Sequence, residues 1–154
     1  MNVIDAIKKK DFKLAEQMID AGADLTVRAE NERTALMYAI LSGQKTLVEK
    51  MVEKGARLED ENIFKQTAVV FAVFMNRVDM LEYLADKGAN LKKPDMNGIT
   101  PVEHAAGWWN ADNMLTFFEK RGIVPNRKLP VIKDVKKKKD GLGIILPDNS
   151  YTRS

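Results

Sequence analysis

The stretch DMNGITPVEHAA, residues 95–106, has the features of a loop that leads into a short helix. The hydroxyl of Thr100 can accept a hydrogen bond from the exposed N–H groups of a first helical turn. Pro101 follows at a position where the missing N–H of proline costs nothing. Thr34 and Thr67 open the similar stretches TALMYAI and TAVVFAV, and the three threonines are evenly spaced along the chain. A repeating structure is therefore predicted.

A second marker has the same period. Gly22, Gly55 and Gly88 are also evenly spaced, at the same interval as the threonines, and alanine follows each of them. Apolar residues recur at helical spacing within 12–19, 47–52, 80–85 and 114–118. A glycine at each helix end suits a left-handed C-terminal cap. Each unit is thus predicted to hold a short helix, a turn, a second helix and a polar loop.

This pattern resembles the ankyrin repeat, which has a period of about 33 residues and a signature with the core T-P-L-H-x-A. The resemblance covers residues 1 to about 124, with a truncated first unit at 2–25 and fuller units near 29–58, 62–91 and 95–123. Proline is kept only at Pro101, and the usual histidine is replaced by Met37, Val70 and Glu103. The expected fold is an all-α ankyrin-type solenoid over 1–124, in which neighbouring units bury a continuous core. Residues 125–154 form a C-terminal extension that is basic and partly apolar.

Composition limits the class of protein. Apolar residues make up 45% and charged residues 31% of the chain, as in globular domains. A membrane span is not expected, because no run of about 18 apolar residues occurs. The N-terminus lacks the charge order of a signal peptide, so a cytoplasmic location is expected, or a nuclear one in a eukaryote. The whole net charge of +3 comes from residues 133–154, which makes nucleic-acid binding an unfavoured interpretation.

Catalytic patterns are not recognisable in the sequence. Cysteine is absent, His104 is the only histidine, and no phosphate-binding or nucleophile motif is found. We interpret His104 as a local hydrogen-bonding or packing residue. The acidic run at 59–61 lacks the glycine turn of a cation loop and is interpreted as a solvated tip. The chain is therefore predicted to be non-enzymatic, with no cofactor and no metal.

The family resemblance implies protein binding through the loop tips and the adjoining face of the first helices, which together form a concave surface. The N-terminal half of this surface is charged and polar, whereas its C-terminal half collects apolar residues. Such a patch is typical of the centre of a protein interface. The predicted partner-binding residues are Arg33, Ile63, Phe64, Phe74, Met75, Met96, Ile99, Trp108 and Trp109. Packing between units is the alternative for some of them, above all for Phe74 and Ile99.

The extension after residue 124 allows several interpretations. LPVIKDV and LGIIL are strand-like, and Asp140-Gly141 between them is a turn signal, so a hairpin is one prediction. It would cover the end of the last unit, or lay GIIL into the apolar patch of this chain or of a neighbour. A solvated tail is the alternative. The oligomeric state is accordingly expected to be a monomer or a weak homo-oligomer, and contact of the basic tail with nucleic acid or an anionic membrane is a third hypothesis.

The two tryptophans mark the one place where the period changes. The step from Met80 to Met114 is one residue longer than the step from Gly55 to Gly88, so one residue is inserted between Val102 and Met114. We predict that it lengthens the helix within GWW, with Asn110 as the cap, because tryptophan is a poor left-handed cap. Trp108 would then face the concave surface, and Trp109 the end of the last unit.

Overall fold

The computed structural model describes residues 1–107 and 112–125, together with the backbone of 137–139 and 145–147. The predicted Trp108, Trp109 and Asn110 lie outside the described residues, as does the Asp140-Gly141 turn. The described elements are α1 (Val3–Lys8), α2 (Phe12–Asp20), the 3-10 turn η1 (Glu30–Glu32), α3 (Ala35–Leu41), α4 (Lys45–Glu53), α5 (Ala68–Phe74), α6 (Val78–Asp86), α7 (Pro101–Ala106), α8 (Asp112–Glu119), β1 (Lys137–Lys139) and β2 (Ile145–Pro147).

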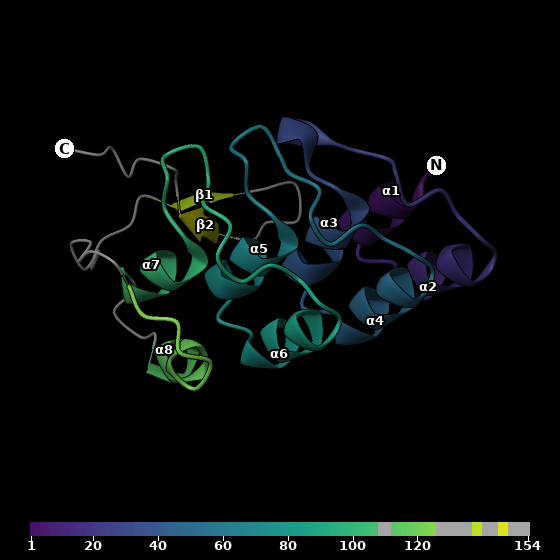
Figure 1. The fold of residues 1–154 in the computed structure, drawn as a ribbon. Helices are drawn as coiled ribbons and strands as arrows, with labels where there is room; N and C mark the ends of the chain where they lie inside the picture. Colours follow the sequence, from purple (N-terminus) through teal and green to yellow (C-terminus); the bar gives the residue numbers. More distant parts are fainter. Residues whose placement is uncertain (108–111, 126–136, 140–144, 148–154) are drawn as a thin grey trace.

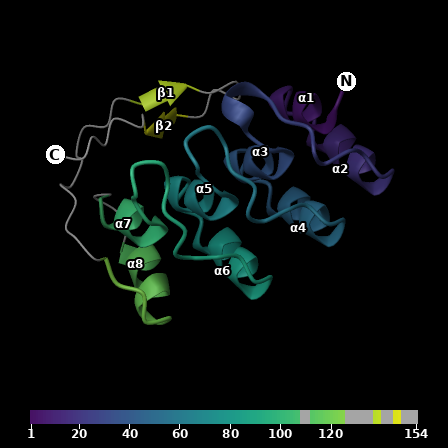
Figure 2. The same ribbon diagram turned by 45° about the horizontal axis from the view of Figure 1, so that its top comes forward.

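The helices form two rows, as the repeat pattern predicts. The short helices α1, α3, α5 and α7 make an inner row, and the longer helices α2, α4, α6 and α8 make an outer row (Figures 1 and 2). Long polar loops connect each pair to the next and project on one side of the stack (Figure 1). The core lies between the rows: all seven residues of α3 are buried, whereas the outer helix α4 buries only Leu47, Val48 and Met51.

Glycines end the outer helices as predicted. Gly22, Gly55, Gly88 and Gly122 all have positive φ angles. At the first of them, the N–H of Ala23 donates to the carbonyl of Met18 at 2.9 Å, which satisfies an otherwise free carbonyl of the last turn. The inner helices α3 and α5 are followed by Gly43 and Asn76, which also have positive φ and so end these helices in the left-handed conformation.

The threonine caps are confirmed at one position only. Thr34 accepts a hydrogen bond from the N–H of Met37 at 3.2 Å. Thr67 makes no capping bond at α5. Thr100 makes none at α7, and its hydroxyl instead donates to Oε1 of Glu103 at 2.9 Å. The recurring threonine thus marks the start of each of these inner helices, but its hydroxyl does not always accept a hydrogen bond from the first helical turn.

The extra residue of the last unit falls between the described ends of α7 and α8. The outer helices α6 and α8 start one residue further apart than the inner helices α5 and α7 do. The insertion therefore lies between α7 and α8, as predicted. However, α7 ends at Ala106 with Gly107 as its C-cap, so it is shorter than α3 and α5. The predicted lengthening of this helix is wrong, because glycine at 107 ends the helix before the tryptophans.

The extension holds an antiparallel pair of short strands. Lys138 of β1 is opposite Leu146 of β2. The predicted hairpin is confirmed in this respect, and LGIIL overlaps β2. The first strand falls on Lys137–Lys139, after the predicted LPVIKDV. Within the described ranges, no helix is long and apolar enough to cross a membrane.

Candidate protein-binding surface

The loop tips of the last two units are closed by the same arrangement of side-chain hydrogen bonds. Oδ1 of Asn62 accepts from the N–H groups of Phe64 at 3.0 Å and of Gln66 at 2.9 Å. Oδ1 of Asp95, at the equivalent position of the next unit, accepts from Asn97 at 2.9 Å and from Ile99 at 3.0 Å. A side-chain acceptor of this kind replaces a backbone turn. The side chains between are therefore pushed outward, and the residue that closes the loop returns to the stack.

Hydrogen bonds connect each loop tip to the tip of the neighbouring unit. The N–H of Ile63 donates to the carbonyl of Asn31 at 2.9 Å, and the N–H of Met96 donates to that of Phe64 at the same distance. Arg28 also donates to the carbonyl of Glu61 at 2.7 Å. These bonds connect residues about one repeat apart, so the tips form a connected edge. A surface prepared in this way loses little conformational entropy when it binds.

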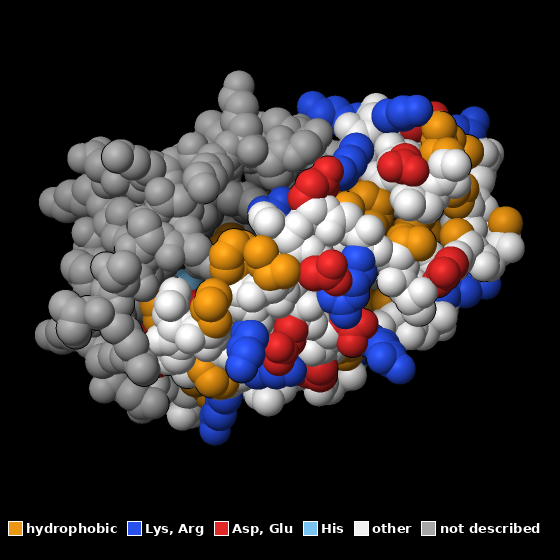
Figure 3. Space-filling view, turned by 90° about the horizontal axis from the view of Figure 1, so that it is seen from above, with side chains coloured by type: hydrophobic (Ala, Val, Ile, Leu, Met, Phe, Trp, Pro, Cys, Tyr) orange, Lys and Arg blue, Asp and Glu red, His pale blue; other side chains and the backbone are white. Residues whose placement is uncertain are grey.

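Two apolar side chains project from this edge. Ile63 is 50% exposed and Met96 is 57% exposed, and they occupy equivalent positions in adjacent units. In the preceding unit the same position holds Glu30. Phe64 is half-buried beside Ile63. The gradient from charged to apolar tips that the sequence predicts is therefore present among exposed side chains. Figure 3 shows hydrophobic side chains among charged ones on this side, one group of them next to the region drawn in grey.

Ile99 is a correction to the predicted surface. It is only 2% exposed, and its carbonyl accepts from the N–H of Asp95 at 3.0 Å. Ile99 closes the loop and points into the stack, so it is a core residue. Gln66, at the equivalent position one unit earlier, is buried in the same way at 4%.

The remaining predicted residues lie at the ends of the inner helices α3 and α5. Phe74, at the end of α5, is half-buried, with its ring edge-on to His104 at 5.1 Å and to Phe71 at 6.1 Å between ring centres. Met75 is half-buried against the core. Arg33 is half-buried, with its guanidinium carbon 5.7 Å from the centre of the Phe71 ring. These three side chains thus serve packing in part, and each keeps some exposed area.

A charged network at the N-terminal tip is not predicted from sequence. Nζ of Lys8 lies 2.6 Å from Oε2 of Glu30, and the hydroxyl of Tyr38 donates to the same oxygen at 2.6 Å. The Lys8 ammonium is also 5.3 Å from the centre of the Tyr38 ring. Tyr38 belongs to the apolar stripe of α3, and only its position in the fold brings the hydroxyl to a carboxylate 8 residues away. The network fixes the tip to the first two inner helices.

This network has a predictable dependence on pH. Hydrogen bonds from Lys8 and then from Tyr38 lower the pKa of Glu30 from 4.5 to about 2. Because the folded pKa lies below the unfolded one, the contribution is complete above about pH 4.5 and is lost as the pH falls toward 2. Glu30 is 66% exposed, so the contribution is expected to stay below about 1 kcal/mol.

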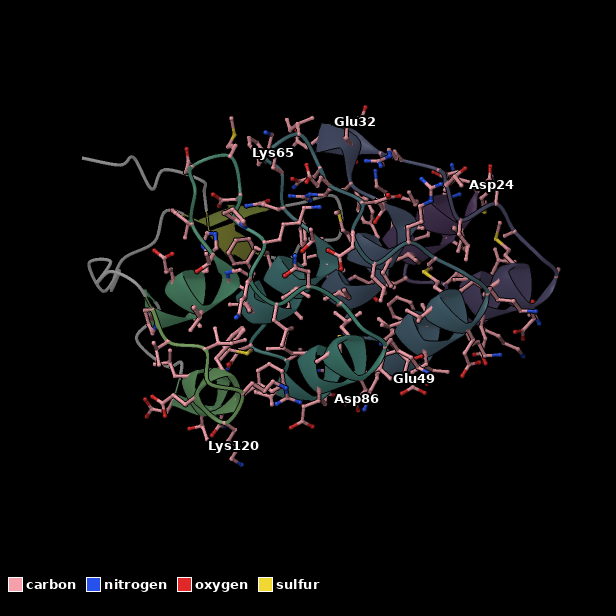
Figure 4. All side chains as sticks on the ribbon, in the orientation of Figure 1. Asp24, Glu32, Glu49, Lys65, Asp86 and Lys120 are labelled. Carbon is pink, nitrogen blue, oxygen red and sulfur yellow. The ribbon has the colours of Figure 1, made fainter. Side chains whose placement is uncertain are left out.

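The variant Glu30→Gln tests this dependence through the melting temperature measured between neutral pH and pH 2. The wild type is expected to be slightly more stable above pH 4.5, and the two proteins are expected to converge at acid pH. Glu32→Gln, on the same tip, is the control (Figure 4). A difference that persists unchanged at pH 2 would contradict the role of the ionised carboxylate.

His104 is a structural residue, as predicted. Its Nε2 lies 2.8 Å from Oδ2 of Asp95, and the two side chains are 0% and 1% exposed. Burial acts to raise the pKa of Asp95, but hydrogen bonds from His104 and from the N–H of Ile99 outweigh it, and the net shift is downward. The sequence analysis did not identify Asp95 as the hydrogen-bond partner of His104. The signal was present: Asp95 and His104 lie on either side of the turn in the opening stretch.

The acidic run at 59–61 connects repeats. Oε1 of Glu59 accepts from the N–H of Asn90 at 2.8 Å, and Oε1 of Glu61 lies 2.9 Å from Nζ of Lys93. Asp60 faces Arg28 at 3.6 Å. In the part of the chain that the structure describes, no group of three or more His, Asp and Glu could hold a metal. The run is thus only partly the solvated tip that is predicted, because its carboxylates are used between loops.

Two hollows near the last unit are small. One of about 260 Å³ lies between α6 and α8, and one of about 250 Å³ is lined by Thr100, Val102 and Ile123, among others. Small-molecule sites are typically larger, about 300–1,000 Å³, and converge several polar groups. Compared with these two hollows, the connected tips with their exposed apolar side chains are the better candidate for a functional site.

Two rows of paired helices with a connected edge of loop tips define the class of helical repeat solenoids that present a binding surface. Comparison with protein families is specific: a model for ankyrin repeats, in 3 copies, matches residues 3–95. The chain belongs to the ankyrin repeat family. A search of curated proteins finds no match to it. The matched region ends at Asp95, and the structure adds a further helix pair, α7 and α8, in the same arrangement. Ankyrin repeats are in general protein–protein interaction modules and are typically not enzymes.

Proposed function

We propose that this protein binds a protein partner through its loop tips and the adjoining inner helices, with apolar contacts at the C-terminal half. The observation that carries the proposal is the pair of exposed apolar side chains, Ile63 and Met96, at equivalent positions on adjacent tips. Exposed apolar groups that recur on a pre-formed edge favour binding, because their burial supplies affinity while the edge costs little to order. Phe64, Phe74 and Met75 would extend the contact inward.

Charged residues at the other end favour a role in specificity. The tip of the second unit presents Glu30, held by Lys8, and the half-buried Arg33 stands beside the inner row. Charges at the edge of an interface affect mainly the choice of partner and the association rate. A partner that fits this surface would have an apolar segment for the last two tips and polar or charged side chains toward the N-terminal end.

The double variant Ile63→Ser/Met96→Ser tests the proposal. Peptides selected from a random displayed library on the full chain supply a defined ligand, and their Kd is measured for wild type and variant. We expect the variant to bind at least about tenfold more weakly, since truncation of central interface residues costs more than about 1 kcal/mol. The melting temperature should barely change, because substitutions at exposed sites usually stay within about 0.5 kcal/mol.

The control is Val124→Ser, which removes an apolar side chain that is 61% exposed but lies after the last helix rather than on a loop tip. Equal weakening by both variants would indicate general adhesiveness rather than a site. Unaltered binding by the double variant would sink the proposal. Chemical shift changes at Ile63, Phe64 and Met96 on addition of the peptide would support it.

A further inference from the structure

The side chain of Met96 extends into solvent from the last loop tip. It is 57% exposed, and the thioether lies near the end of the side chain. The backbone beneath it is fixed, because the N–H of Met96 donates to the carbonyl of Phe64 at 2.9 Å and Oδ1 of Asp95 accepts from the N–H of Asn97 at the same distance. The tip therefore cannot withdraw this side chain into the stack without breaking hydrogen bonds.

The other methionines are protected to different degrees. All eight methionines of the chain lie among the described residues. Four of them are core residues with at most 1% exposure: Met37, Met51, Met80 and Met114. Met18 and Met75 are partly buried against the core, and Met1, at the start of the chain, is 71% exposed. Because an oxidant must contact the sulfur, Met96 is the one methionine within the repeats that is readily oxidised.

Oxidation at this position would change the character of the tip. Ile63, at the equivalent position one unit earlier, is apolar and has no sulfur to oxidise. When hydrogen peroxide is the oxidant, the thioether sulfur attacks one peroxide oxygen, the O–O bond breaks, and the other oxygen leaves as water. The sulfur loses two electrons, the peroxide gains them, and an apolar side chain becomes a polar sulfoxide. One of the paired apolar side chains on the edge is thereby lost.

We propose that Met96 is an oxidation-sensitive switch of the binding surface, and that its sulfoxide, formed by a hydroperoxide, weakens binding of the protein partner. The effect on binding rests on the proposed function, whereas the selective oxidation of Met96 does not. A sulfoxide oxygen that is buried against an apolar partner loses its hydrogen bonds to water, and this loss weakens binding by at least about fivefold. Methionine sulfoxide reductases convert the sulfoxide back, so the switch is reversible.

Selective oxidation is measured on the full chain treated with hydrogen peroxide at neutral pH. Catalase stops the reaction at intervals, and peptide mapping by mass spectrometry gives the oxidised fraction at each methionine. Met96 is expected to react at least about tenfold faster than the four core methionines, which are reached only when the structure opens. Saturation with the selected peptide should slow the reaction at Met96 and leave that at Met1 unchanged. If Met96 reacts as slowly as Met37, or the peptide does not protect it, the proposal is overturned.

The matched control for binding is Met96→Leu, carried through the same peroxide treatment. Leucine is similar in size and apolar character but has no sulfur, and the variant keeps all the other methionines. On oxidation, the Kd of the wild type for the selected peptide should rise at least about fivefold, whereas that of Met96→Leu should stay the same. Treatment with methionine sulfoxide reductases A and B, which act on the two sulfoxide epimers, should restore the affinity of the wild type. The melting temperature should barely change, because the oxidised side chain is exposed.

Two results would overturn the switch in ways that differ from failure of the proposed function. Equal weakening of the wild type and of Met96→Leu would assign the effect to another methionine. Complete oxidation of Met96 with an unaltered Kd would show that the sulfoxide is tolerated, while weaker binding by Ile63→Ser/Met96→Ser would still support the proposed function. Unaltered binding by that double variant would instead sink the proposed function and leave the selective oxidation of Met96 standing.

Discussion

Replacement of Phe71 by alanine is expected to lower the free energy of unfolding by about 3–5 kcal/mol. Phe71 is 1% exposed and lies on α5, which packs against α3, α6 and α7. Removal of its ring takes apolar area from the core and leaves a cavity that the rigid helix pairs cannot fill. The cation contact from Arg33 and the edge contact from Phe74 are lost with it.

The repeat architecture makes this effect larger than in a terminal unit. In a solenoid, stability is a sum of unit stabilities and interfaces between neighbours, and α5 takes part in two such interfaces within the inner row. Guanidinium unfolding of the full chain measures the loss. We expect the transition to move to lower denaturant and to broaden if the halves on either side of α5 uncouple.

Phe74→Ala is the matched control, because it removes the same ring one turn later on the same helix. Phe74 is half-buried, so its loss should cost clearly less, about 1–2 kcal/mol. Equal effects at Phe71 and Phe74 would mean that Phe74 is a core residue, and its place on the proposed binding surface would have to be abandoned.

Asp95→Ala is the second large expected effect, a destabilisation of about 3 kcal/mol. One carboxylate serves three donors: the N–H groups of Asn97 and Ile99 and the ring of His104. Because the side chain of Asp95 is only 1% exposed, water cannot replace it readily. Each buried donor left without a partner costs about 1–3 kcal/mol. The tip that carries Met96 should loosen, which is measurable as faster amide exchange at Asn97 and Ile99.

Asp95→Asn separates the two roles of this residue. Asn62 already makes the same loop bonds one unit earlier, so asparagine at position 95 should keep the tip ordered. The amide nitrogen that replaces Oδ2 can only donate, so the bond from His104 to a carboxylate is lost and the ring keeps a partner only by changing its tautomer. The difference between the asparagine and alanine variants therefore measures the loop bonds, and the difference between wild type and asparagine measures the contact with His104. If alanine and asparagine prove equally destabilising, the loop bonds contribute little and the His104 contact dominates.

Local chemistry explains which features are predictable. Gly22, Gly55 and Gly88 are expected as left-handed caps, and they have positive φ because few other residues tolerate that conformation. The inserted residue of the last unit is found by counting, since a period does not depend on packing. Within that insertion the prediction is wrong at Gly107, because it gives the low helix propensity of glycine less weight than the poor capping by tryptophan.

The period, the helix pairs, the glycine caps of the outer helices and the rows of equivalent positions were determined by the sequence alone, because each depends on residues a few positions apart and on a spacing that can be counted. Only the tertiary structure decided which member of a row is exposed. Ile63 and Met96 project from the tips, whereas Ile99, which closes the loop after Met96, is buried. The direction of each side chain follows from the hydrogen bonds that close its loop and from the unit that packs beside it. The same dependence on neighbours brings Tyr38 to Glu30 and His104 to Asp95.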